Sequence, residues 1–150
     1  MTRVLPYAPD DLFAMVGDVD RYPEFVPWIT AMRTWNAKDI EPGVSIVDAE
    51  AGVGFSFLRE TFATRVIRDA GARHIAVNLL RGPFRVLRNN WRFLPHPEGT
   101  QIEFSIEFEF KTRLLDAFLA ANMDRAVDKL IACFEDRAKT LFAVRTASQA

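Results

Sequence analysis

Strict alternation of apolar and polar residues marks residues 101–110. The even positions, from Ile102 to Phe110, are all apolar, whereas the odd positions are polar or acidic. A period of two is typical of a β-strand that has one face in the core and the other in water. Residues 85–93 show the same pattern, and the large apolar side chains on one face are Leu87, Trp91 and Phe93. The pattern therefore predicts two strands of a half-buried sheet.

Turn-forming residues divide the chain from about residue 29 to about residue 111 into five or six strands. These turns contain Gly or Pro and lie at residues 41–43, 69–71, 81–83 and 95–99. No helical spacing occurs between them, and a parallel pair of strands would need a long crossover connection. We therefore expect an antiparallel meander.

A strand and two short helices are predicted before this meander. Residues 2–7 have the composition of a first strand. Pro9 fits the first turn of a helix, and Gly17 fits its end. Asp20 can cap a second, very short helix.

The last third of the chain returns to helical spacing. Apolar residues recur every three or four positions across roughly residues 113–143, with a kink or restart expected at Asn122. Together the elements predict an α+β protein in which a curved antiparallel sheet of about six or seven strands surrounds a long C-terminal helix. A chain of 150 residues suits one domain, 1–150.

The segment 20–29, DRYPEFVPWI, is both irregular and hydrophobic. Its two prolines shorten any regular element, yet it carries several large apolar side chains. We expect Phe25, Val26 and Trp28 to form a mobile lid at one end of the sheet. The alternative is that they fill the core permanently.

A sheet that surrounds a helix leaves a tunnel wherever side chains do not fill the space between them. We expect the sheet and the helix each to contribute an apolar wall, and the alternative is that these residues are ordinary core. The proposed wall residues are Trp91, Phe93, Phe104, Ile106, Phe108, Leu115, Leu119, Met123 and Val127. A buried methylene contributes about 0.8 kcal/mol, so an apolar tunnel suffices to bind a lipid.

Composition indicates the class of protein and limits the kinds of site that we expect. The content of 49% hydrophobic and 26% charged residues is that of a globular protein. The single cysteine, Cys133, excludes an internal disulfide and fits a reducing cytoplasm. With only two histidines, His74 and His96, no zinc-ligand spacing exists, so we expect no metal site.

Positive charge is concentrated between residues 59 and 92. This segment contains eight arginines and only two acids, Glu60 and Asp69. Its local charge is therefore +6, whereas the whole chain has a net charge of −1. We expect the face carrying Arg81, Arg85, Arg88 and Arg92 to dock on anionic lipid or RNA phosphate. The alternative is a solvated set of strand faces.

Four stretches resemble a known family: residues 12–29, 82–93, 102–111 and 133–142. They are similar to the START and polyketide-cyclase superfamily and, within it, to the coenzyme Q-binding START-like family, which includes toxins of the RatA type. The resemblance covers nearly the whole chain and implies a helix-grip fold. It also implies a bound ubiquinone or similar polyprenyl lipid, and a carrier role that supports respiratory electron transport.

A quinone headgroup offers only hydrogen-bond acceptors. We therefore expect the tunnel to present a donor, and the candidates are the Asn89 amide, the Trp91 indole and the Tyr22 hydroxyl. Apart from ubiquinone as a ligand, no cofactor is expected. The resemblance also implies a cytoplasmic protein at the periphery of the inner membrane.

Two other functions remain open. A ribosome-associating regulator would use the arginines outside and need no ligand inside. A cyclase or dehydratase would need a titratable pair in the tunnel, and only Asp48 and Glu50 suggest one. We expect both to be exposed to solvent, and therefore expect no catalytic residues and no enzymatic activity.

Overall fold

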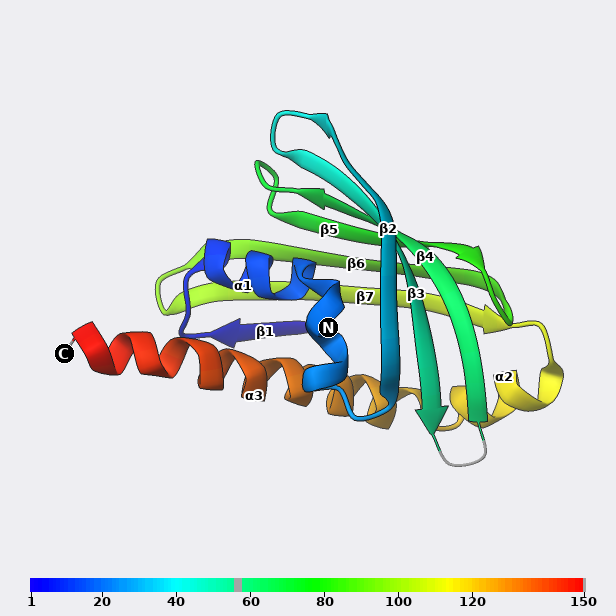
Figure 1. The fold of residues 1–150 in the computed structure, drawn as a ribbon. Helices are drawn as coiled ribbons and strands as arrows, with labels where there is room; N and C mark the ends of the chain where they lie inside the picture. Colours follow the sequence, from blue (N-terminus) through cyan, green and yellow to red (C-terminus); the bar gives the residue numbers. More distant parts are fainter. Residues whose placement is uncertain (56–57, 150) are drawn as a thin grey trace.

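A seven-stranded antiparallel sheet curves around the last helix in the computed structural model (Figure 1). The structure describes the backbone of residues 1–55 and 58–149, and the side chains of residues 1–54, 59–117 and 121–142. The elements, in chain order, are β1 (Thr2–Leu5), α1 (Pro9–Gly17), the 3-10 helix η1 (Val19–Glu24), β2 (Ile29–Glu41), β3 (Val44–Phe55), β4 (Leu58–Asp69), β5 (His74–Arg81), β6 (Phe84–His96), β7 (Gly99–Phe110), α2 (Arg113–Ala120) and α3 (Met123–Gln149).

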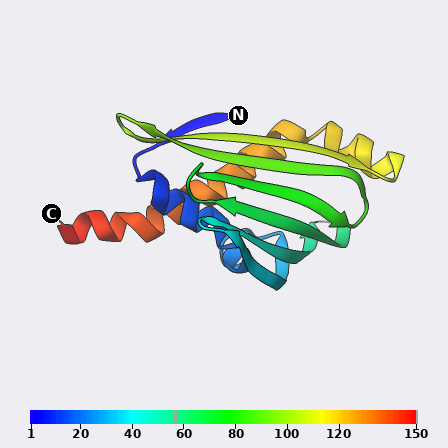
Figure 2. The ribbon, with the colours of Figure 1, turned by 90° about the horizontal axis from the view of Figure 1, so that it is seen from above.

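The strands follow the order β1-β7-β6-β5-β4-β3-β2. The six strands from β2 to β7 form the predicted meander, and β1 closes it by pairing with β7. The α+β helix-grip architecture is therefore confirmed, including the two short helices after the first strand. Seen from above, α3 runs across one face of the sheet (Figure 2).

The C-terminal helix is interrupted where the sequence predicts it. α2 ends at Ala120 and α3 begins at Met123, so the break includes Asn122. α2 lies at the end of the sheet opposite to the C-terminus (Figure 1). None of the described helices is long and apolar enough to cross a membrane.

The main core lies between α1, the middle of the sheet and α3. Its buried members come from all three layers: Leu12, Met15, Val16, Val19, Val47, Ala49, Val66, Ile75, Trp91, Phe93, Ile102, Phe104, Ile131, Phe134 and Ala138. On β7 the burial alternates as predicted, with Ile102 and Phe104 buried and Glu107 exposed.

A second group of aromatic rings lies toward the ends of the strands near α2. Phe84 stacks on Phe110 with ring centroids 4.6 Å apart, and Phe62 contacts Phe84 edge-to-face at 5.3 Å. The turn between β5 and β6 requires glycine there, because Gly82 has a φ of +149° and a Cβ would lie 2.6 Å from the Phe62 Cβ. Phe110 is buried, but Phe62 and Phe84 are only half-buried. The interior is therefore dense near α1 and looser near α2.

Candidate functional site

Three of the predicted wall residues are ordinary core in this structure. Trp91, Phe93 and Phe104 are each no more than 4% exposed. The Trp91 ring lies 4.8 Å from Phe104 and 4.9 Å from Phe134 of α3, measured between centroids. A small cavity beside Trp91 and Phe104 measures about 10 Å³, which is the space of one water molecule. The tunnel expected behind these three residues is filled, because α1 and α3 close on them.

The other wall residues lie toward α2 and are only half-buried. They are Ile106 and Phe108 of β7, Leu115 of α2, and Met123 and Val127 of α3. The side chain of Leu119 lies outside the described residues. At this end of the interior, apolar side chains from the sheet and from both helices remain partly open to solvent. Their contact with a ligand stays a prediction.

The predicted lid has one fully buried residue and two half-buried ones. Val26 is fully buried and therefore belongs to the core. Phe25 is half-buried, and its ring meets that of Phe134 edge-to-face with centroids 5.2 Å apart. Trp28 is also half-buried. The segment after η1 thus rests on α3, as a lid would, while one residue anchors it.

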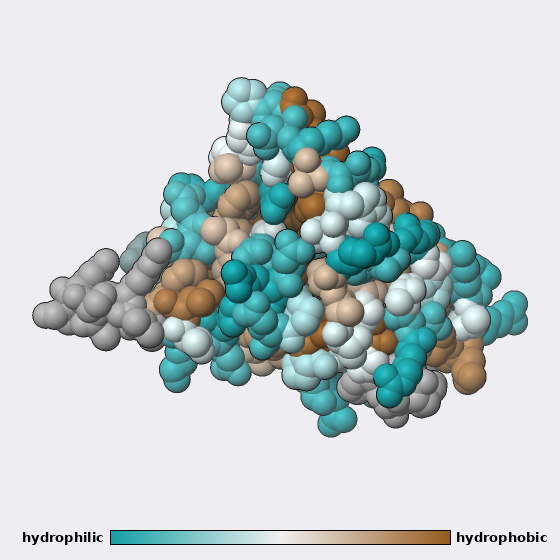
Figure 3. Space-filling view, viewed as in Figure 1, coloured by the Kyte–Doolittle hydropathy of each residue, from teal (hydrophilic) through white to brown (hydrophobic). Residues whose placement is uncertain are grey.

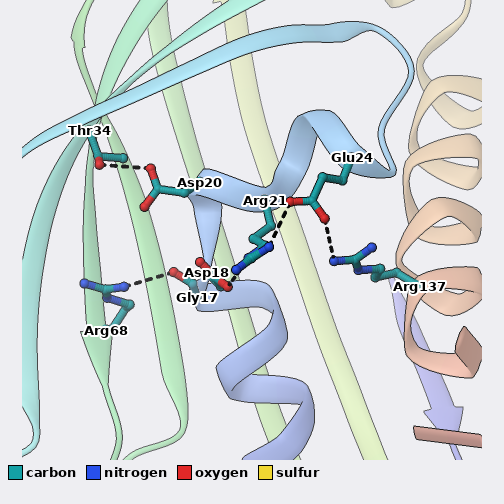
Figure 4. A network of polar contacts seen from close by, with 8 residues as sticks. All are labelled: Gly17, Asp18, Asp20, Arg21, Glu24, Thr34, Arg68 and Arg137. Atoms are coloured by element: carbon teal, nitrogen blue, oxygen red, sulfur yellow. Dashed lines mark hydrogen bonds and ion pairs between the residues drawn. The ribbon is translucent and has the colours of Figure 1, made fainter. Parts of the chain in front are cut away.

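An ion pair links η1 to α3 beside this contact (Figure 4). Arg137 Nη2 lies 3.1 Å from Glu24 Oε1, and the Arg137 guanidinium carbon lies 5.1 Å from the centre of the Phe25 ring. Arg21 also donates to Glu24, at 3.2 Å. Partial desolvation raises the pKa of Glu24, but the hydrogen bonds from Arg137 and Arg21 outweigh it and hold that pKa below its usual value. The carboxylate therefore stays ionised in this arrangement.

Two further polar contacts fix η1 and the end of α1 to the sheet (Figure 4). Thr34 of β2 donates its hydroxyl to Asp20 Oδ1 at 2.9 Å. Arg68 of β4 donates to the Gly17 carbonyl at 3.0 Å. The η1 segment is therefore held from both the sheet and α3, which sequence patterns do not reveal because the partners are far apart in the chain.

Each of the three proposed donors for a quinone makes a hydrogen bond within the protein. The Tyr22 hydroxyl donates to the Val16 carbonyl. The Trp91 indole donates to Asn89 Oδ1 at 2.8 Å, and the Asn89 amide donates to the Ser105 carbonyl at 2.8 Å. Burial, with a smaller effect from the Asp18 carboxylate, raises the pKa of Tyr22, so its hydroxyl stays neutral. Among the described residues, no buried side-chain nitrogen or oxygen lacks a partner.

Three of the four predicted docking arginines form ion pairs with glutamates. Arg85 lies 3.2 Å from Glu109 and Arg88 lies 3.3 Å from Glu107, in both cases across β6 and β7. Arg81 lies 2.5 Å from Glu50 of β3. Arg92, also exposed, stands opposite Glu103 in the strand register. Because these glutamates offset the arginines, the net positive charge of this face is much smaller than the number of its arginines. The docking role of the face stays a prediction.

Asp48 and Glu50 face away from the interior, on the side of β3 opposite to the core residues Val47 and Ala49. The expectation that both are exposed is wrong, because Asp48 is 3% exposed and Glu50 is half-buried. Arg65 Nε lies 2.9 Å from Asp48 Oδ1. The two carboxylates therefore do not provide an acid–base pair inside the fold.

An irregularity in β2 explains the burial of Asp48. The register with β3 shifts between Trp35 and Lys38, and Asn36 has a φ of +58°. This shift places the Asn36 amide 3.2 Å from Asp48 Oδ2. A bulge of this kind has no clear signal in the sequence, so the pairing was not predictable.

Asp48 should make the stability of the fold depend on acid pH. The hydrogen bond from Arg65 holds the pKa of Asp48 below its usual value; desolvation opposes this and Asn36 assists it. Its contribution is therefore complete above the unfolded-state pKa, about 3.9, and is lost as pH falls through the folded-state pKa. We expect Asp48→Asn to show a smaller loss of stability in acid than the wild type, measured as urea midpoints between neutral and acid pH. Equal acid slopes would show that Asp48 contributes nothing.

Comparison with known proteins identifies the family. The chain is 36% identical over 141 residues to the ribosome association toxin RatA of Rickettsia prowazekii, covering 92% of this chain and 93% of that one. It is 26% identical over 145 residues to a protein of Xenopus laevis named coenzyme Q-binding protein COQ10 homolog B, covering 94% of this chain and 57% of the relative. The solution structure of the 18 kDa protein CC1736 from Caulobacter crescentus is 65% identical, with a TM-score of 0.80 and coverage of 95% and 96%.

The family model supports the same assignment. Residues 5–135 match the model described as polyketide cyclase/dehydrase and lipid transport. The match spans strands β2 to β7, the η1 segment and the part of α3 that carries Phe134. The chain therefore belongs to the polyketide cyclase/dehydrase and lipid transport family.

Proposed function

We propose that the protein binds ubiquinone or a related polyprenyl lipid and carries it. The observation that supports this most directly is the looser end of the interior. There Phe108, Leu115 and Met123 are half-buried, and Ile106 and Val127, also half-buried, pack against the edge of the filled main core. An apolar chain that covers these side chains would complete the burial that the protein alone leaves unfinished.

The energetics suit a prenyl chain. At about 0.8 kcal/mol per buried methylene, one isoprene unit contributes about 3 kcal/mol before ordering costs. Because the single donors of Tyr22 and Trp91 and one N–H of the Asn89 amide already have partners, binding depends mainly on the apolar tail. A relative named as coenzyme Q-binding supports the choice of ligand class.

A carrier role fits better than catalysis. Asp48, the buried carboxylate considered for acid–base work, is bound to Arg65 on the outer side of the sheet. General acid–base catalysis needs a group within hydrogen-bond reach of the substrate, and this pair lies on the wrong face for a substrate held inside. We therefore infer a binding protein rather than a cyclase.

The direct test is native mass spectrometry of freshly purified protein, followed by solvent extraction and lipid analysis. We expect a bound species whose mass matches a polyprenyl quinone. Protein that carries no lipid, and that also takes up none from ubiquinone-containing detergent, would contradict the proposal.

Ribosome association is the second candidate function. It is favoured by the similarity to proteins named ribosome association toxin RatA, which match more closely in sequence than the coenzyme Q-binding relative does. Sucrose-gradient sedimentation of the protein with separated ribosomal subunits tests it. Co-migration with one subunit would support this function, and migration at the top of the gradient would contradict it.

A further inference from the structure

The outward face of α2 is apolar although it is exposed. Leu114 is 78% exposed, and Ala117 and Ala121 are exposed on the same side of the helix, three and seven positions further along. The helical turn continues through Ala121, whose N–H donates to the Ala117 carbonyl at 3.2 Å. A helix surrounded by water normally carries charged or polar residues on such a face.

Basic residues border this apolar face. Lys111 and Arg113 precede Leu114, and Arg125 follows at the start of α3; all three are exposed. Asp116 points a carboxylate oxygen back to the Phe110 N–H, at 3.2 Å, rather than outward. The three basic residues outnumber Asp116 and Asp124, so the border has a net positive charge. An apolar centre with a basic border is typical of a helix that lies in the interface of an anionic membrane.

The same helix adjoins the proposed lipid site. Leu115, next to Leu114, is half-buried together with Phe108 and Met123. Figure 3 shows hydrophobic atoms reaching the surface at the end of the molecule where α2 lies. The same helix therefore carries both the exposed Leu114 and the proposed wall residue Leu115.

We propose that α2 docks on the surface of an anionic lipid bilayer. Leu114 enters the boundary between headgroups and acyl chains, and Lys111 and Arg113 contact the lipid phosphates. This inference rests on the proposed function in one respect, because the membrane is then the source of the bound lipid. It also differs from docking by the outer face of the sheet, where Arg85 and Arg88 are paired with glutamates.

Vesicle flotation of the whole protein tests the proposal. We use phosphatidylcholine vesicles with and without phosphatidylglycerol, and expect binding only to the anionic ones. Leu114→Gln should weaken this binding about tenfold, because the leucine side chain no longer gains from burial. Ile40→Gln is the matched control, since Ile40 is 58% exposed in β2, outside α2, and should bind like the wild type.

Charge reversal provides a second measurement. The double variant Lys111→Glu, Arg113→Glu should weaken binding about tenfold or more at low salt. High salt should reduce the difference, because it screens surface charges. The melting temperature of each variant should stay close to that of the wild type, since all the changed side chains are exposed.

Three results would overturn the proposal. The first is a wild type that does not bind anionic vesicles, and the second is an equal loss of vesicle binding in Leu114→Gln and Ile40→Gln. The third is a wild-type dimer that Leu114→Gln converts to a monomer, because the α2 face would then be an interface between two copies. Lipid extracted from the same samples separates the two proposals. Bound lipid without vesicle binding refutes docking alone, whereas Leu114-dependent vesicle binding without bound lipid supports docking and refutes the lipid carrier.

Discussion

Replacing Phe134 with alanine is expected to lower the free energy of unfolding by about 3–5 kcal/mol. Phe134 is buried on α3, and its ring meets Trp91, Phe25 and Tyr22 at centroid distances of 4.9, 5.2 and 5.3 Å. The substitution removes three aromatic contacts and leaves a cavity that the curved sheet cannot close. Domains of this size are stable by about 5–15 kcal/mol, so the loss is a large share of the total.

Urea unfolding monitored by circular dichroism measures this change. Leu141→Ala is the control on the same helix, because Leu141 is exposed and its loss should change stability by no more than about 0.5 kcal/mol. A loss below about 1 kcal/mol for Phe134→Ala would show that the joint between η1, the sheet and α3 does not depend on this ring.

The fold is predictable because its elements have clear local periods. The alternation on β7 correctly assigns Ile102 and Phe104 to the core and Glu107 to solvent. The helical spacing after residue 113 and the restart at Asn122 are likewise local features. The helix-grip arrangement is implied by the resemblance to the family, because the periodicity of one element does not show how the elements pack together.

The candidate site is less predictable because it depends on which elements close on each other. The sequence assigns Trp91 and Ile106 to the same apolar face but does not show that α1 and α3 bury Trp91 while Ile106 stays half-open. Phe134 belongs to the helical stripe, yet its role as the joint with η1 requires the tertiary packing. Arg137 lies three positions after Phe134, on the same side of the helix. This spacing is the sequence signal that could have suggested a joint between α3 and η1.

The charge pattern shows the same limit. Counting arginines between residues 59 and 92 predicts a strongly basic face. The strand register instead sets Arg88 opposite Glu107 and Arg92 opposite Glu103, so acids from β7 offset the bases of β6. Cross-strand partners come from separate segments, and a count within one segment therefore overestimates the charge that a partner would meet.

Phe108→Glu is expected to abolish binding of the proposed prenyl lipid. Phe108 is half-buried on the inner face of β7, at the looser end of the interior, with its ring 5.8 Å from that of Phe110. A carboxylate at this position would have to be desolvated when a prenyl chain covers it, and an unpaired buried charge is costly. Because the side chain is only half-buried without a ligand, the charge can stay hydrated in the empty protein, which should remain folded.

Two further variants make this result specific to the inner face. Ser105→Glu adds the same charge to the same strand, but Ser105 is exposed on the outer face, so lipid content should be unchanged. Phe108→Trp adds volume without charge and should reduce lipid content by occupying the space of the prenyl chain. Extraction and mass spectrometry measure the lipid, and circular dichroism checks the fold. A folded Phe108→Glu protein with normal lipid content would place the ligand elsewhere. Full occupancy in Phe108→Trp would lead to the same conclusion even if the glutamate variant failed to fold.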